Sequence, residues 1–281
     1  RDLHRLIRRQ RQMCIRDRIP LPPLEEQWGI AEVLSTVDRA IEAADCLIGR
    51  LKRFKKALMQ ELLTKGIGHE EFKDTPIGKI PKEWELSHLV NIAKIFDCKH
   101  RTPKYYSHGF PVLLPRNVRE GYIDLKEAPR TSYEEYLDLT EKYKPQKYDI
   151  IYTRNAKVGI AGIVLTEEPF ALGQDLVAIR ATEKINPKFL LYVLNSNIIR
   201  IQLLRAQTGS TFKRINLGLI KKFLIPLPSY QEQQKIADIL WSIDEWIQAE
   251  EQRKEKLERL MRGLMNILLT GRVRVRVERV S

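Results

Sequence analysis

Two long stretches of the chain carry apolar residues at alternating steps of four and three, with charged residues between them. In the first stretch these residues are Ile30, Leu34, Val37, Ile41, Ala44, Ile48, Leu51, Leu58 and Leu62. In the second they are Ile236, Leu240, Ile243, Ile247, Leu257, Leu264 and Leu268. This spacing gives a narrow apolar stripe, which is typical of a coiled-coil seam. We therefore predict two long helices that pair antiparallel with each other, and Lys55 interrupts the seam of the first.

The two stretches are copies of one segment. Residues 19–64 and 225–270 align without a gap at an offset of 206, and 19 of the 46 positions are identical. Both copies open with Ile-Pro-Leu-Pro, where proline keeps the chain extended, and both end with Leu-Leu-Thr. Gly66 and Gly271 follow as helix stops. An internal duplication explains this better than two unrelated helices that each pack on their own core.

The copies differ near their middle. Glu250 and Lys254 stand where the first copy has Ala44 and Ile48. Two charged residues in place of two apolar ones would weaken a seam, so we expect the pairing there to be looser or shifted.

The segment between the copies has the short, mixed pattern of an α/β domain. Residues 67–83 carry several Gly and Pro and indicate a linker. Apolar runs at 110–114, 149–153, 162–165 and 176–179 predict strands, and residues 132–142 and 187–206 predict helices. The tail 273–281 alternates Val and Arg, which indicates a short edge strand or a basic tail. The predicted fold class is α+β, with one mixed α/β domain flanked by two long helices in an antiparallel coiled coil.

Composition points to an acidic partner. The chain has 49 Lys and Arg against 36 Asp and Glu, a formal charge of +13. Three cysteines without pairable spacing favour a reducing compartment. No apolar run in the given sequence is long enough to span a bilayer, and none has the pattern of a signal peptide.

The first 18 residues do not resemble a protein segment. Arg8 to Arg18 match the in-frame translation of a transposase-type sequencing adapter, and Arg1 to His4 match a flow-cell primer end. We therefore exclude residues 1–18 from the fold. They contribute seven Arg and two Asp, a net +5 of the +13, so the rest of the chain remains basic at +8. The alternative is a native basic arm that binds phosphate.

The duplicated segments resemble a known family. Residues 19–27, Ile-Pro-Leu-Pro-Pro-Leu-Glu-Glu-Gln, lead into a helix ending Leu-Met-Gln-Glu-Leu-Leu-Thr. This pattern resembles the central conserved region of type I restriction–modification specificity subunits, and the second copy is similar to their distal conserved region. The segment between resembles one target recognition domain, with its Ile77–Trp84 opening, its Asp149-Ile150-Ile151 strand and its Gly209–Leu217 lead into the second helix. Tyr148 stands where the family usually has Gly, so we expect the turn there to differ.

The resemblance implies a domain order. Residues 19–66 would be the central conserved region, 67–224 the linker and target recognition domain, 225–272 the distal conserved region and 273–281 a tail. A complete subunit of the family runs domain, helix, domain, helix, whereas this chain runs helix, domain, helix. We therefore expect an upstream recognition domain in the natural protein.

The resemblance also implies a function and partners. The chain would be a cytoplasmic, non-catalytic subunit that binds double-stranded DNA and recognises one half of a bipartite target. Methyltransferase and restriction subunits would dock on the helices. S-adenosylmethionine and ATP would belong to those subunits, so no cofactor is expected in this chain. A helix of roughly 40 residues would span about 60 Å, more than one DNA turn.

Four basic stretches are candidates for DNA contact, because Lys and Arg neutralise phosphates while Arg, Asn and Gln can bind base edges. They lie at 98–106, 116–119, 154–159 and 209–214. Candidates for base contacts are Arg116, Asn117, Arg154, Asn155 and Gln174. Candidates for phosphate contacts are Lys99, Arg101, Lys104, Lys157, Lys213 and Arg214, and Thr102, Arg119, Ser210 and Thr211 complete the set. Each could instead be a solvated loop residue, and Asn155 could simply cap a turn.

Enzymatic motifs are absent from the sequence. It has no Gly-rich phosphate loop ending in Gly-Lys-Ser/Thr, and Cys98, His100 and His108 lack zinc spacing. Three other functions stay open: a natural half-subunit that homodimerises on a palindrome, the remainder of a nuclease–methylase fusion, and a coiled-coil scaffold without a DNA role. The gene sequence upstream distinguishes the half-subunit and the fusion from a subunit with two recognition domains. A measurement of DNA retention tests the scaffold function.

Overall fold

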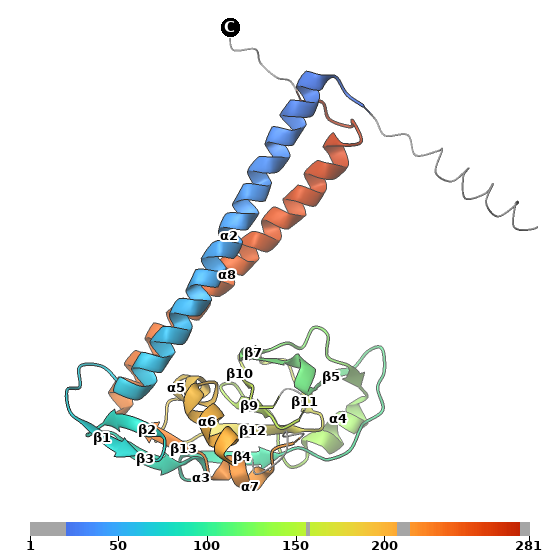
Figure 1. Ribbon diagram of the computed structural model, residues 1–281. Helices are drawn as coiled ribbons and strands as arrows, with labels where there is room; N and C mark the ends of the chain where they lie inside the picture. Colours follow the sequence, from blue (N-terminus) through green and yellow to red (C-terminus); the bar gives the residue numbers. More distant parts are fainter. Residues whose placement is uncertain (1–20, 156–157, 207–213, 276–281) are drawn as a thin grey trace, which may run out of the picture. The chain divides into compact units, whose positions relative to one another are not determined.

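The structure is a computed structural model that describes residues 21–155, 158–206 and 214–275 (Figure 1). It forms two compact units. The helical unit comprises the residues up to Lys52 together with those from Glu245 onward, and the mixed α/β unit comprises Arg53–Asp244. The predicted adapter-derived residues 1–18 lie outside the described residues. None of the described helices is long and apolar enough to cross a membrane.

The helical unit is built from two long helices, α2 (Leu24–Lys65) and α8 (Tyr230–Leu268), which also extend into the other unit. Within the helical unit they run antiparallel, because Asp45 pairs with Lys254 at 2.7 Å while Lys52 pairs with Glu251 at 2.7 Å. The predicted antiparallel pairing is therefore confirmed.

The charged positions in the middle of the second copy do not open the seam. Ala44 and Ile48 remain 3% and 7% exposed. Lys254 lies beside them and reaches Asp45, while Glu250 accepts a hydrogen bond from Arg253 on its own helix. The two charges thus lie at the edge of the apolar contact, where water still reaches them.

The mixed α/β unit contains the remaining elements. Its helices are α3 (Leu89–Ile92), α4 (Tyr133–Thr140), α5 (Pro187–Leu194), α6 (Asn197–Arg205) and α7 (Leu217–Lys221), with a 3-10 turn η1 (Pro115–Asn117). Its strands are β1 (Phe72–Thr75), β2 (Gly78–Pro81), β3 (Glu85–His88), β4 (Ala93–Asp97), β5 (Phe110–Leu113), β6 (Val118–Arg119), β7 (Gly121–Ile123), β8 (Arg130–Thr131), β9 (Ile150–Thr153), β10 (Ala161–Ile163), β11 (Ala171–Leu172), β12 (Leu176–Ala181) and β13 (Leu224–Leu227). All four predicted strands and both predicted helical segments are present.

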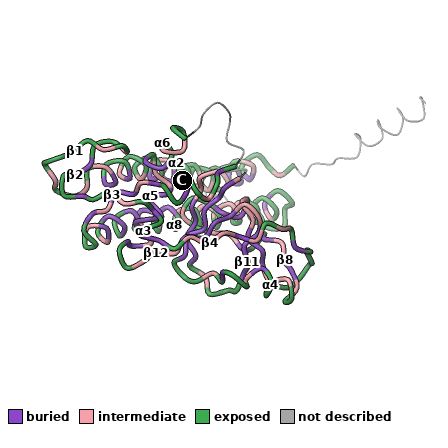
Figure 2. The backbone as a smooth tube through the Cα atoms, turned by 90° about the horizontal axis from the view of Figure 1, so that it is seen from below, coloured by how far each residue is buried: buried purple, intermediate pink, exposed green. Residues whose placement is uncertain are grey.

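A six-stranded sheet in the order β4-β12-β9-β10-β7-β6 forms the centre of this unit. Among the described strands of this sheet, β10 and β7 pair in parallel and the other neighbours pair antiparallel. Alternate residues of β9 and β12 enter two different cores. Ile150 and Tyr152 pack with α5, and Ile151 packs on the other face with Leu113 and Leu172. Because both faces of the sheet are covered, all four residues of β9 are buried, and its sequence does not alternate between apolar and polar residues. Figure 2 shows buried residues along the central strands.

The ends of both long helices belong to the core of this unit. Met59, Leu62 and Leu63 near the end of α2, and Ile236 and Leu240 near the start of α8, pack in the same cluster as the sheet and α5. The compact unit therefore extends from Arg53 to Asp244, so it contains residues 67–224 together with the adjoining ends of both long helices.

Three local features differ from the sequence expectations. The predicted linker contains the β1–β2 hairpin, whose strands are mostly exposed and so show no apolar alternation. The predicted helix 187–206 is two helices, with a break at Asn195. Residues 273–275 of the tail form no strand, and residues 276–281 lie outside the described residues.

The turn before β9 keeps the backbone of a glycine although Tyr148 stands there. Tyr148 has φ +69°, in the left-handed region that favours glycine. Its amide donates to the Val164 carbonyl at 2.8 Å. The next residue, Asp149, is 1% exposed and accepts hydrogen bonds from Tyr143 at 2.6 Å and Arg180 at 2.7 Å. The buried Asp149 contacts thus hold the geometry of this turn, and whether it differs from that of the family stays a prediction.

Candidate nucleic-acid interface

Two of the four basic stretches, 98–106 and 154–159, leave the central sheet at one edge, beside the segment that precedes β12. β4 ends at Asp97, opposite Val177, and β9 ends at Thr153, opposite Leu176. Three segments therefore meet: the one after β4, the one after β9 and the one before β12. A hydrogen bond of 3.0 Å from the Gln174 amide to the Thr102 hydroxyl links two of them directly.

Arg154 lies inside this edge and not on its surface. It is 6% exposed, its Nε donates to the Ile215 carbonyl at 3.0 Å, and its guanidinium donates to Asp97 Oδ1 at 2.6 Å. A buried guanidinium with these partners cannot reach a base edge in this conformation. We therefore assign Arg154 a structural role in place of the predicted base contact.

Asn117 also has a structural role. It is 4% exposed, and its side-chain oxygen accepts a hydrogen bond from the Leu114 amide at 3.3 Å. Its carbonyl accepts from the Asp124 amide at 2.8 Å. The side chain thus closes the η1 turn and is buried there, in place of the predicted base contact.

Asn155 and Arg214 meet around the carboxylate of Asp175. The Asn155 amide donates to Asp175 Oδ2 at 3.2 Å, and Arg214 Nε lies 3.3 Å from Asp175 Oδ1. Arg214 is also 3.3 Å from His100 Nδ1. Both residues lie at the sheet edge, and the Arg214 side chain is 49% exposed, so they remain candidates for DNA contact together with Gln174 and Thr102.

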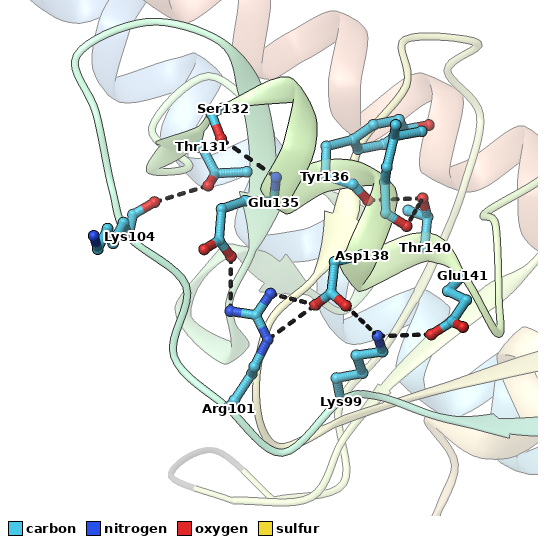
Figure 3. Close-up of polar contacts among 11 residues, drawn as sticks. Lys99, Arg101, Lys104, Thr131, Ser132, Glu135, Tyr136, Asp138, Thr140 and Glu141 are labelled. Carbon is cyan, nitrogen blue, oxygen red and sulfur yellow. Dashed lines mark hydrogen bonds and ion pairs between the residues drawn. The ribbon is translucent and has the colours of Figure 1, made fainter.

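Lys99 and Arg101 are held by the carboxylates of α4. Lys99 Nζ lies 2.6 Å from Asp138 and 2.9 Å from Glu141, and Arg101 pairs with Asp138 and, at 2.7 Å, with Glu135 (Figure 3). The hydrogen bond to Lys99 lowers the pKa of Asp138, and contact with Lys99 likewise lowers the pKa of Glu141. The same contacts raise the pKa of Lys99. These two cations are therefore engaged within the protein.

Lys104, Arg116 and Arg119 are the candidates with accessible cationic groups. All three are exposed, and among the residues that the structure describes none of them forms an ion pair. Burial raises the pKa of the Tyr105 hydroxyl, and the charge of Arg116 lowers it by less, which places Arg116 near Tyr105. Tyr105 is 42% exposed. Lys157, Ser210, Thr211 and Lys213 lie outside the described residues.

One cluster has the composition of a metal site. Ligand atoms of Asp97, Cys98 and His100 lie within 4.8 Å of one another. However, Asp97 binds the guanidinium of Arg154, and His100 faces that of Arg214. Burial raises the pKa of the Cys98 thiol, which disfavours the thiolate that binds metals. Two cations and a protonated thiol oppose metal binding, so we assign no metal here.

The acidic residues at this edge were missed by the sequence analysis. Asp97, Asp175, Glu135, Asp138 and Glu141 decide which basic side chains are engaged. The only local signal was the run Glu134-Glu135 with Asp138 at the start of a predicted helix. Such acidic residues are common at helix N-termini for reasons unrelated to partners, so that signal could not identify the contacts.

Comparison with known proteins gives the family. A family model described as type I restriction modification DNA specificity domain matches residues 81–259. The type I restriction enzyme MjaVIII specificity subunit of Methanocaldococcus jannaschii is 34% identical over 267 residues, which cover 92% of this chain and 63% of that protein. The type I restriction enzyme EcoBI specificity subunit of Escherichia coli is 28% identical over 242 residues, covering 78% of this chain and 49% of that protein. The chain thus spans about half to two thirds of the length of these relatives.

Solved structures show the same fold. The HsdS subunit from Thermoanaerobacter tengcongensis superposes with a TM-score of 0.53 at 19% identity, covering 91% of this chain and 61% of that one. The type I restriction–modification system S subunit from M. genitalium gives a TM-score of 0.58 at 16% identity, covering 87% and 61%. The predicted α+β class with two long paired helices is confirmed.

Proposed function

Because the chain belongs to the family of type I restriction–modification DNA specificity domains, we propose that it recognises one half of a bipartite DNA target. The observation that supports this best is the sheet edge, where the segments after β4 and β9 meet the one before β12. Their polar side chains, together with the basic ones in the adjoining loops, can supply base and phosphate contacts. The proposed contact residues are Thr102, Lys104, Arg116, Arg119, Asn155, Gln174 and Arg214.

The proposed subunit is non-catalytic. The methyltransferase and restriction subunits would supply the chemistry, S-adenosylmethionine and ATP, and would dock on the helical unit. The outward residues of α2 and α8 there are strongly charged, which suits a polar, exchangeable protein interface.

The duplicated segment supports a second recognition domain as a partner. In the second copy, Ala237 and Leu240 are fully buried in the mixed α/β unit. Their equivalents in the first copy, Ala31 and Leu34, are exposed and half-buried. The local structure is nevertheless retained, since Gln27 donates to the Pro22 carbonyl at 2.8 Å as Gln233 does to the Pro228 carbonyl at 3.0 Å.

We therefore propose that the first copy holds a second recognition domain as the second copy holds this one. That domain would be either an upstream part of the natural protein or a second copy of this chain on a palindromic target. Light scattering of the 281-residue chain with and without DNA separates the two. A monomer supports the upstream domain, and a two-fold symmetric dimer supports the half-subunit.

Selection from a random duplex library tests the proposed function. We expect the chain to enrich one short motif, with retention that falls as salt rises because phosphate contacts release counterions. The same motif should appear as one half of a methylated bipartite sequence in the methylome of the source strain. Retention of no duplex, or retention that does not depend on salt or sequence, would favour the scaffold function and contradict the proposal.

A further inference from the structure

The ion pairs between α4 and the loop after β4 form a compact group, which we call the α4 cluster: Lys99, Arg101, Glu135, Asp138 and Glu141 (Figure 3). Asp138 is its centre, since it pairs with both Lys99 and Arg101. Glu135 and Glu141 flank it, each on one of the two cations. Three carboxylates thus surround two cations.

The charge of the α4 cluster is not balanced. The contacts lower the pKa of Asp138 and of Glu141 and raise that of Lys99, so these groups are charged at neutral pH. Three negative groups surround two positive ones, so the carboxylates more than offset the charges of Lys99 and Arg101, and Lys104 is the loop cation outside these pairs. A DNA phosphate that approaches Lys99 and Arg101 therefore meets cations whose attraction the neighbouring carboxylates already offset.

The carboxylates are held in place by the fold. Ser132 caps α4 by accepting a hydrogen bond from the Glu135 amide at 3.3 Å. Tyr136 is 5% exposed and stacks on Phe110 with ring centroids 4.4 Å apart. Thr131, just before the helix, donates to the Lys104 carbonyl at 2.7 Å and so fixes the loop beside it. The acidic groups are therefore presented by a packed helix, whereas the long Lys99 and Arg101 side chains can turn away.

The pairs are partly accessible to solvent, since the Lys99 and Arg101 side chains are 21% and 40% exposed. The Asp138 and Glu141 side chains are 45% and 66% exposed. Ion pairs that solvent reaches are weak and easily exchanged for another anion. A phosphate offers the same hydrogen-bond geometry as a carboxylate to a guanidinium or an ammonium group.

We propose that the acidic face of α4 is an autoinhibitory contact that competes with DNA phosphates for Lys99 and Arg101. This proposal rests on the proposed function and adds a regulation to it. With both cations engaged, duplexes of any sequence bind weakly. When base contacts elsewhere hold the target in place, a phosphate near the loop displaces the carboxylates. The contact thus suppresses binding to random sequence more than binding to the target.

A purely structural role predicts a different outcome. If the α4 cluster only anchors the loop, removing a carboxylate disorders two cations and leaves DNA affinity unchanged or lowers it. If the carboxylates compete with phosphate, removing one raises affinity for random DNA. The sign of the change in affinity distinguishes the two roles.

The test compares Asp138→Asn with Glu134→Gln in the full chain, with a random-sequence duplex as the probe. Both variants remove one negative charge from α4, but Glu134 is exposed and forms no ion pair among the described residues. We expect Asp138→Asn to bind the duplex roughly three- to tenfold tighter at low salt, with a salt slope steeper by about 1 to 2. Glu134→Gln should bind like the unchanged chain. Adding Lys99→Ala and Arg101→Ala to Asp138→Asn should remove the gain.

Two results would overturn the autoinhibitory contact: equal affinities for Asp138→Asn and Glu134→Gln, or weaker binding by Asp138→Asn while its thermal unfolding midpoint is unchanged. If Asp138→Asn unfolds, Glu141→Gln replaces it, because Glu141 is exposed and contacts Lys99 alone in the cluster. Failure of the proposed function looks different. In that case neither the unchanged chain nor any variant retains duplex DNA.

Discussion

The guanidinium of Arg154 joins three parts of the mixed α/β unit. It contacts Asp97 at the end of β4, and it donates to the carbonyl of Ile215, which lies 61 residues further along the chain. Its own amide donates to the Asp175 carbonyl at 2.9 Å. Arg154 therefore holds the sheet edge together, and its removal should lower the stability of the fold more than it changes DNA binding.

Arg154→Ala should lower the free energy of unfolding by about 2 kcal/mol, because Asp97 and the Ile215 carbonyl lose a charged donor. Urea denaturation measures this. Arg119→Ala serves as the control, since Arg119 is exposed and its removal should cost less than about 0.5 kcal/mol. Unchanged stability of Arg154→Ala together with altered preference at one base pair would restore the base-contacting role.

Tyr148→Gly should stabilise the protein. Tyr148 holds φ at +69°, and the left-handed region costs a residue with a Cβ roughly 1 kcal/mol. The Tyr148 ring itself adds little stability, because Lys147 Nζ lies 5.9 Å from its centroid and the residue is 45% exposed. We expect urea denaturation to show a gain of about 1 kcal/mol in the free energy of unfolding. A decrease in stability would mean that the ring contributes more than the backbone strain costs.

Some residues could not be assigned from sequence because their partners are distant. Asn117 and Arg154 follow predicted strands, just as the exposed Arg116 and Arg119 do, and Lys99 and Arg101 lie in a basic stretch of the same kind. What separates them is a set of acidic and carbonyl partners, some of them 37 to 61 residues away in the chain. The residue types and their local spacing predict a basic surface. Contacts with residues far away in the chain decide which of the basic side chains face solvent.

At the scale of elements, the long helices were predictable because their signal is local and occurs twice. The helix that starts at Leu24 and ends at Lys65, before Gly66, follows the sequence signals closely. The break between α5 and α6 was not predictable. It follows from Asn195, whose side chain bonds with the amide and carbonyl of Ala161 in β10, both at 2.9 Å.

Lys55 shows how the fold accommodates a charge in an apolar seam. Its Nζ lies 2.6 Å from Asp244, and Tyr192 donates to the same carboxylate at 2.7 Å. The Lys55 side chain is 13% exposed. The polar group fixes the register of α2 against α8 at this position, because a shift would leave a half-buried charge without a partner.

Asp244→Asn should therefore lower the free energy of unfolding by about 2 kcal/mol. Glu251→Gln is the matched control. Its partner Lys52 is 57% exposed, so we expect a decrease below about 0.5 kcal/mol. Thermal or urea unfolding of both variants measures the difference. Equal small decreases in the free energy of unfolding for both variants would contradict this. Lys55 would then bind water or another partner, and it would not set the register of α2 against α8.

At the scale of the whole molecule, the proposal depends on one mixed α/β unit that binds DNA and one helical unit that does not. The duplicated helix, the basic charge and the recognition unit were all evident in the sequence. The side chains that we propose to contact DNA were only partly evident, since acidic groups neutralise some of the basic residues. Lys104, Arg116 and Arg119 are the members that both sequence and structure favour.

The most direct test of this claim compares two triple variants in a salt titration of duplex binding. One carries Lys104→Ala, Arg116→Ala and Arg119→Ala. The other carries Arg50→Ala, Lys256→Ala and Arg262→Ala, which remove the same charge from exposed positions of the helical unit. The account predicts that the first variant loses about 2 to 3 units of the slope of log K against log salt, while the second keeps it. An equal or larger loss in the second variant would place the DNA on the helices and contradict the account.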